Sequence, residues 1–164
     1  MYRIRTKANE LTTSQDVPVL DPELVFHAHS GKIHRVTGWL LVASENGEGI
    51  SIGISAPDGS FCLGRFEIPG GGKERDGYLQ ERTVNAPGEM GTSTVRDETG
   101  IGLATIRAMV ILPEGIEGDV GILFGPDPDN VAVVTLHPQS FIEIYSGDTD
   151  IEIEDLPGYL PGEI

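Results

Sequence analysis

The sequence is poor in cysteine, in basic residues and in long apolar runs, and each shortage excludes a class of protein. A single cysteine, Cys62, excludes an intrachain disulfide framework. The 164 residues hold 11 Lys and Arg against 26 Asp and Glu, a net charge of −15. Binding to nucleic acid or to an anionic membrane requires clustered positive charge instead. With no bilayer-length apolar run and no signal-peptide pattern, we expect a soluble protein made in a cytoplasm.

Aromatic residues are also scarce, at 6% of the chain, and helical periodicity is missing. The nearest helix candidate, residues 95–99, is too short and is flanked by Gly91 and Gly100. What the chain does contain is 22 glycines and 11 prolines, which suit short strands separated by turns.

Several segments alternate between apolar and small or polar residues, the pattern of a half-buried strand. The clearest cases are residues 50–56, 102–112, 119–124 and 141–145. Residues 39–43 are apolar on both faces, which is typical of a central strand. Because turn residues separate these runs at short intervals, the sequence predicts an all-β protein, an antiparallel two-sheet sandwich.

Three stretches interrupt this strand pattern. Residues 1–20 carry basic and then polar residues, which predict an N-terminal arm that leads into a first strand. Residues 69–92 are rich in glycine and charge and are expected to form a long loop within a domain spanning 21–146. Residues 147–164 are acidic and contain apolar residues between prolines, which fits either an extended docking tail or a frayed terminus.

Four segments carry a resemblance to a known family: Ile4-Arg5-Thr6-Lys7, the run from Leu20 to Phe26, the run from Ile33 to Leu41, and residues 50–59, which close on Pro57-Asp58-Gly59. Together they resemble small virion proteins of tailed bacteriophages with a tumour-necrosis-factor-like or viral jelly-roll fold. The chain departs from that pattern at His34, where the family more often has tyrosine, and in a weak glutamine-rich penultimate strand. The resemblance implies a two-sheet jelly roll, often trimeric, located on the virion.

On this resemblance we expect a capsid decoration (cement) protein made in the host cytoplasm. It would be a homotrimer that binds the major capsid protein on the outer capsid surface and stabilises the head. Arg3, Arg5 and Lys7 are the candidate capsid contacts. The alternative is a tail-fibre or spike domain that binds a host cell-surface glycan, with Tyr78, Tyr145 and Tyr159 as candidate exposed aromatics. Neither role involves nucleic acid, a membrane or a cofactor.

The sequence predicts no enzymatic activity, because its best enzymatic motif is incomplete. A Nudix hydrolase motif is partly matched by the run from Phe66 to Lys73 together with residues 95–101. However, Ser93 and Thr94 occupy the positions of the Arg-Glu pair that the motif requires. Only Asp97 and Glu98 match the later acidic pair, which leaves magnesium short of ligands. The same glycines are not a P-loop, because Glu74 follows Lys73 where Ser or Thr is needed.

Histidines and acidic turns offer weaker metal candidates. His27, His29 and His34 share one face if a two-residue turn joins their strands, and zinc could use that cluster. The phage-protein resemblance instead turns His34 inward, which separates the three. Calcium could use one of two acidic turns, although both fit ordinary Asx turns. The first turn holds Asp127, Asp129 and Asn130, and the second holds Asp148 and Asp150.

Overall fold

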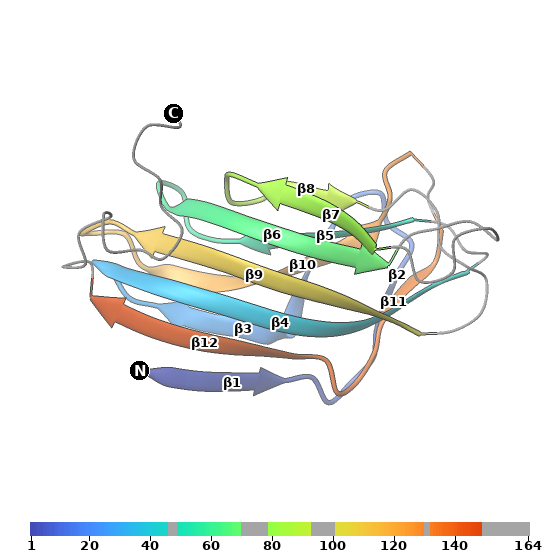
Figure 1. The fold of residues 1–164 in the computed structure, drawn as a ribbon, viewed down its shortest axis with the longest axis horizontal. Coiled ribbons are helices and arrows are strands. Elements are labelled where there is room, and N and C mark those ends of the chain that lie inside the picture. Colours follow the sequence, from blue (N-terminus) through green and yellow to red (C-terminus); the bar gives the residue numbers. More distant parts are fainter. Residues whose placement is uncertain (46–48, 70–78, 93–100, 130–131, 149–164) are drawn as a thin grey trace.

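The computed structural model describes residues 1–45, 49–69, 79–92, 101–129 and 132–148, with the side chains of 69 and 79–82 excepted. Within these ranges every helix or strand element is a β-strand (Figure 1). The same ranges contain no helix with the length and apolar character needed to cross a membrane.

The strands form two antiparallel sheets. Sheet A, the larger, contains in spatial order β1 (Tyr2–Thr6), β12 (Phe141–Asp148), β4 (Lys32–Ser44), β9 (Gly102–Leu112), β6 (Phe61–Pro69) and β7 (Leu79–Val84), with β11 (Val134–Leu136) beside β4 and β2 (Leu11–Thr13) beside β11. Sheet B contains β3 (Val19–Ala28), β10 (Gly118–Pro126), β5 (Ile50–Ser55) and β8 (Met90–Thr92).

The chain passes back and forth between the sheets, so β3, β4, β5 and β6 lie alternately in sheet B and sheet A. The strands β8, β9 and β10 alternate in the same way, and the two layers face each other (Figure 1). This wrapping is that of a jelly roll, in which consecutive strands contribute to opposite walls of one core. It confirms the predicted all-β, two-sheet sandwich.

Strand alternation builds the core between the two layers. Ile50, Ile52 and Ile54 of β5 are almost completely buried, as are Ile122 and Phe124 of β10. From sheet A, the side chains of Val36, Leu40, Val42, Ile106 and Ile144 join the same cluster. The predicted central strand is confirmed as well, because β4 pairs with β9 on one side and with β12 on the other.

The predicted long loop over residues 69–92 is wrong. Residues 79–84 form β7, which pairs antiparallel with β6, and residues 90–92 form β8 at the edge of sheet B. The segment looked like a loop because β7 is an edge strand rich in charged and polar residues, the composition that protects a sheet edge from unwanted pairing. Val84 alone supplies a described, deeply buried side chain of β7.

Residues 1–20, predicted as an N-terminal arm with a first strand, contain strands that belong to the sandwich. β1 pairs with β12 over five residues and β2 pairs with β11. Between them lies Lys7, whose ammonium is buried with the carboxylate of Asp21 on β3 at 2.5 Å and lies 3.3 Å from a carboxylate oxygen of Glu23. Both Asp21 and Lys7 are almost fully covered. Residues 1–20 are therefore attached to both sheets.

This buried pair leads to a first prediction. Lys7→Met would leave the Asp21 charge buried without its counter-ion, a loss that typically costs about 3–5 kcal/mol of unfolding free energy. Urea denaturation followed by circular dichroism measures this loss. The matched control is Arg5→Met, which changes an exposed cation two residues earlier and should cost no more than about 0.5 kcal/mol. Equal stability of the two variants would contradict the structural role of Lys7.

A second prediction concerns pH. The backbone N–H of Asn9 donates a hydrogen bond to Glu23, which is the main reason that the pKa of Glu23 falls from 4.5 to about 2. Because the unfolded chain binds this proton more tightly, the stabilisation is present above about pH 4.5 and is lost as pH falls toward 2. The stability difference between the wild type and Glu23→Gln should therefore shrink across that window. Urea titrations at several pH values test this, and a constant difference would contradict it.

Candidate functional site

The outer face of sheet A carries large uncovered side chains. Six of the eleven exposed large hydrophobic residues that the structure describes point out from its strands. Half-buried residues extend the same surface, and Trp39 stacks on Phe141 with ring centres 5.0 Å apart. We call this surface the aromatic–arginine face. Its exposed apolar members are Tyr2, Ile4, Phe61, Leu63, Leu103 and Tyr145.

Three exposed arginines lie among these residues, namely Arg35, Arg65 and Arg107. The sheet register sets Arg107 opposite Arg65 on one side, while Arg35 is opposite Tyr145. Among the described side chains that point outward from these strands, the acidic ones are Glu67 and Glu143. Three arginines against two glutamates give the described outward side chains an excess of one positive charge, in a chain whose net charge is −15.

A shallow hollow of about 330 Å³ lies at one end of this face. Its lining residues are Tyr2, Arg35, Thr37, Glu143 and Tyr145, from β1, β4 and β12. The Tyr2 hydroxyl donates a 2.8 Å hydrogen bond to Glu143, and this bond raises the pKa of Tyr2. The hollow combines two aromatic rings with a cation, a hydroxyl and a carboxylate.

The structure separates the three predicted capsid contacts. Lys7 is buried and paired with Asp21, so its ammonium is not on the surface of the protein. Arg3 and Arg5 stand opposite Ile144 and Ile142 in the β1–β12 ladder and therefore point to the other side of sheet A from Tyr2. Arg5 is exposed and Arg3 is half-buried.

The three histidines do not form one cluster either. β3 and β4 lie in different sheets, and His34 faces inward, where its ring centre lies 5.4 Å from that of Phe26. Burial lowers the pKa of His34, and its Nδ1 lies 2.8 Å from the Ser146 hydroxyl oxygen. The inward orientation implied by the resemblance is the one observed, because His34 belongs to the even positions that are buried from residue 34 to residue 42 of β4, while the odd positions between them are half-buried or exposed.

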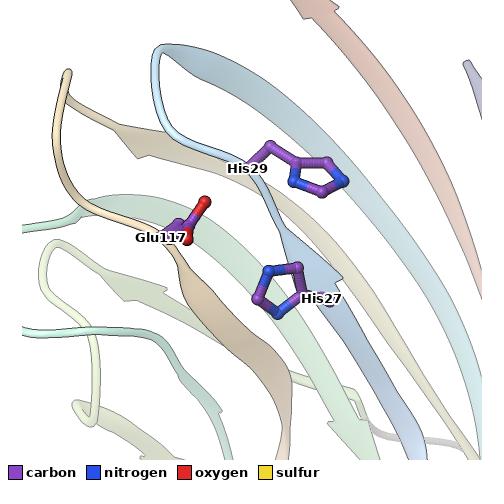
Figure 2. A group of neighbouring side chains, drawn as sticks. All are labelled: His27, His29 and Glu117. Carbon is purple, nitrogen blue, oxygen red and sulfur yellow. The ribbon is translucent and has the colours of Figure 1, made fainter.

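His27 and His29 are exposed and lie close together. The third residue of their group is Glu117, where the sequence led us to expect His34. The two histidines project from β3 and from the residue just after it, and Glu117 precedes β10 (Figure 2). The side-chain atoms able to bind a metal lie within 4.8 Å of one another in this group. We call His27, His29 and Glu117 the histidine–glutamate cluster.

The other candidates have structural explanations. Asp127 is buried and accepts a 3.0 Å hydrogen bond from the backbone N–H of Asp129, an Asx turn, and Asp148 is paired with Lys32. Asn130 and Asp150 lie outside the described residues, as do Tyr78 and Tyr159. Cys62 is a buried core side chain, and this burial raises the pKa of its thiol to about 11.

The Nudix-like stretch lies mostly outside the described residues, including Ser93, Thr94, Asp97 and Glu98. The described parts between the two halves of the motif, β7 and β8, are strands in different sheets.

Sequence reasoning missed the aromatic–arginine face and Glu117. Arg107 could have been placed outward, because the predicted inward face of its strand already held Ala104, Ile106 and Ala108. Glu117 gave no local signal, since only the pairing of β10 with β3 brings it beside His29.

Comparison with known proteins yields little. No protein-family model matches the chain, and no curated protein sequence matches it. Among solved structures, a chain from the "Structure of infectious bursal disease virus Gt strain" aligns with 99% of this chain and 45% of its own length, at 13% identity and a TM-score of 0.21. A chain from the Gx strain of that virus aligns with 89% of this chain and 39% of its own length, at 12% identity and a TM-score of 0.21. This chain spans less than half of either protein, and the similarity is too weak to carry a functional argument.

Proposed function

We propose that the chain is a structural component of a virus particle, a capsid decoration protein that binds the outer capsid surface through its aromatic–arginine face. The observation that carries this proposal is the uncovered outer face of sheet A. Large apolar side chains that are exposed together on one face of a folded protein mark an interaction surface.

The composition of the face supports a protein partner. Stable protein–protein contacts are enriched in Tyr, Trp, Phe, Met and Arg and depleted in Lys, Asp and Glu. The face contains Trp39, Phe141 and Met109 besides its exposed tyrosines and arginines. Tyrosine, tryptophan and arginine are also the residues most often found to dominate binding energy.

The arginines of the aromatic–arginine face indicate what kind of protein it would bind. A locally positive face on an acidic protein complements a partner that presents acidic groups beside apolar ones. A two-fold contact between copies would place the same face on both sides and bring both sets of arginines into one contact. We therefore assign the face to the capsid. The homotrimer is a separate part of the proposal and rests on the phage-protein resemblance.

Capsid attachment can be measured by cosedimentation with genome-free heads of the encoding phage. The double charge reversal Arg35→Glu with Arg107→Glu should weaken binding about tenfold or more, because it opposes the complementary charge and lies among the aromatic anchors. Phe61→Ser with Leu63→Ser should weaken it to a similar degree. Circular dichroism checks that the variants remain folded.

Arg5→Glu is the matched control, because it reverses an exposed charge on the other side of sheet A. It should bind heads like the wild type. If Arg5→Glu abolishes binding while the face variants bind normally, the contact lies at the rim of β1 and our assignment is wrong. Failure of the wild type to bind heads at all would exclude the decoration role.

The hollow beside Tyr145 favours a second candidate function, a fibre or spike domain that binds a glycan. Carbohydrate sites combine an aromatic platform with a few polar groups that orient hydroxyls, and the hollow offers both. This alternative predicts that the wild type binds at least one glycan on an array and that Tyr145→Ala abolishes the signal. Tyr2→Phe, which removes only one hydroxyl, should reduce it less. An array without signal would exclude the alternative.

A further inference from the structure

The β3–β10 ladder places histidines and carboxylates in pairs on the outer face of sheet B. Asp119 is opposite His27, and Gly118 is opposite Ala28. His29 follows Ala28 and Glu117 precedes Gly118, so both lie just beyond this last pair of the ladder. Residues two apart on a strand point to the same face, and directly opposite residues have Cβ atoms about 4.5–5.5 Å apart. Two imidazoles and two carboxylates therefore converge from two adjacent strands.

The spacing suits a small metal ion. The metal-binding atoms of His27, His29 and Glu117 lie within 4.8 Å of one another. Bonds of about 2.0–2.2 Å to a tetrahedral zinc ion bring ligand atoms to about 3.3 Å apart. All three side chains are exposed, so rotation about their side-chain bonds can close the difference without moving the strands.

Asp119 adds an independent feature of metal sites. Its Oδ1 lies 3.3 Å from Nδ1 of His27. A carboxylate that accepts the Nδ1–H proton holds the ring in the tautomer whose Nε2 is unprotonated, and this arrangement recurs behind metal-bound histidines. Asp119 would then act as a positioning residue, while Nε2 of His27 faces the ion.

We propose that His27, His29 and Glu117 form a binding site for a divalent transition metal, with Zn²⁺ as the preferred ion. Neutral imidazoles with one carboxylate are a ligand set that zinc uses and that calcium and magnesium, which take oxygen ligands, do not. Three protein ligands leave a fourth tetrahedral position for water. The bound ion would join β3, an edge strand of sheet B, to β10 at one end of the sandwich.

Isothermal titration calorimetry of the full chain with zinc chloride tests the site. The wild type should bind one zinc ion, and saturating zinc should raise the melting temperature, because the site exists only in the folded state. His27→Ala, His29→Ala and Glu117→Gln should each weaken zinc binding by more than about tenfold. The matched control is His137→Ala, which removes a half-buried histidine that follows β11 of sheet A and should leave zinc affinity unchanged.

The role of Asp119 has its own readout. Asp119→Ala should weaken zinc binding about tenfold, at the lower end of the effect of such partners, without changing the melting temperature of the metal-free protein. Asp119→Asn keeps an oxygen acceptor and should restore most of the affinity. Calcium at the same concentration should displace no zinc.

Two results would overturn the proposal. One is a wild type that shows no zinc binding. The other is binding that persists unchanged in both His29→Ala and Glu117→Gln, because the ion would then lie elsewhere on this acidic chain. Imidazole resonances in NMR separate these cases directly: zinc should shift the signals of His27 and His29 and leave that of His137 in place.

Discussion

The attachment of the N-terminal segment to the sandwich depends on the buried ion pair between Lys7 and Asp21, because this pair joins the N-terminal strands of sheet A to β3 of sheet B. The second oxygen of Asp21 accepts the backbone N–H groups of Glu23 and Leu24, each at 2.9 Å. A buried carboxylate is tolerated only when its charge is paired and its lone pairs are filled. Both conditions are met here, so the pair holds β3 at Asp21 against the segment between β1 and β2. Tyr2 on one outer face and His27 on the other take their positions from these strands.

The two outer faces differ in how much of each is covered by the protein's own side chains. Sheet B has glycines at outward positions, and a Cβ atom on Gly53 would lie 2.5 Å from the sulfur of Met90. One on Gly121 would lie 2.8 Å from Leu20. Side chains of the protein itself thus pack over these bare backbone positions. Sheet A carries bulky residues outward instead, and its own described side chains leave many of them exposed. A separate partner is the physical solution for such a face.

Strict alternation made the fold predictable from the sequence, because the apolar positions of strands such as β5 and β9 are the ones that face the core of the sandwich. The prediction failed where tertiary pairing overrides local composition. β7 is polar because it is an edge strand. The sequence around Lys7 suggests a surface cation, because its buried partner Asp21 is known only from the folded structure. The histidine cluster failed for a topological reason: the turn after β3 crosses between sheets, so no hairpin register links His29 with His34. Glu117, not His34, lies beside the two exposed histidines, and it is nearly ninety positions away from them in the chain.

The position of the two proposed sites on opposite faces makes them physically independent. The aromatic–arginine face lies on the outside of sheet A and the histidine–glutamate cluster lies on the outside of sheet B, with the whole buried core between them. Substitutions on well-separated surfaces with no shared partner act additively. Salt also screens exposed charges on the two faces from each other, because the Debye length is about 8–10 Å. Metal binding at β3 and β10 can therefore stabilise the fold without altering the docking surface. A ligand on that surface would in turn leave the imidazoles accessible.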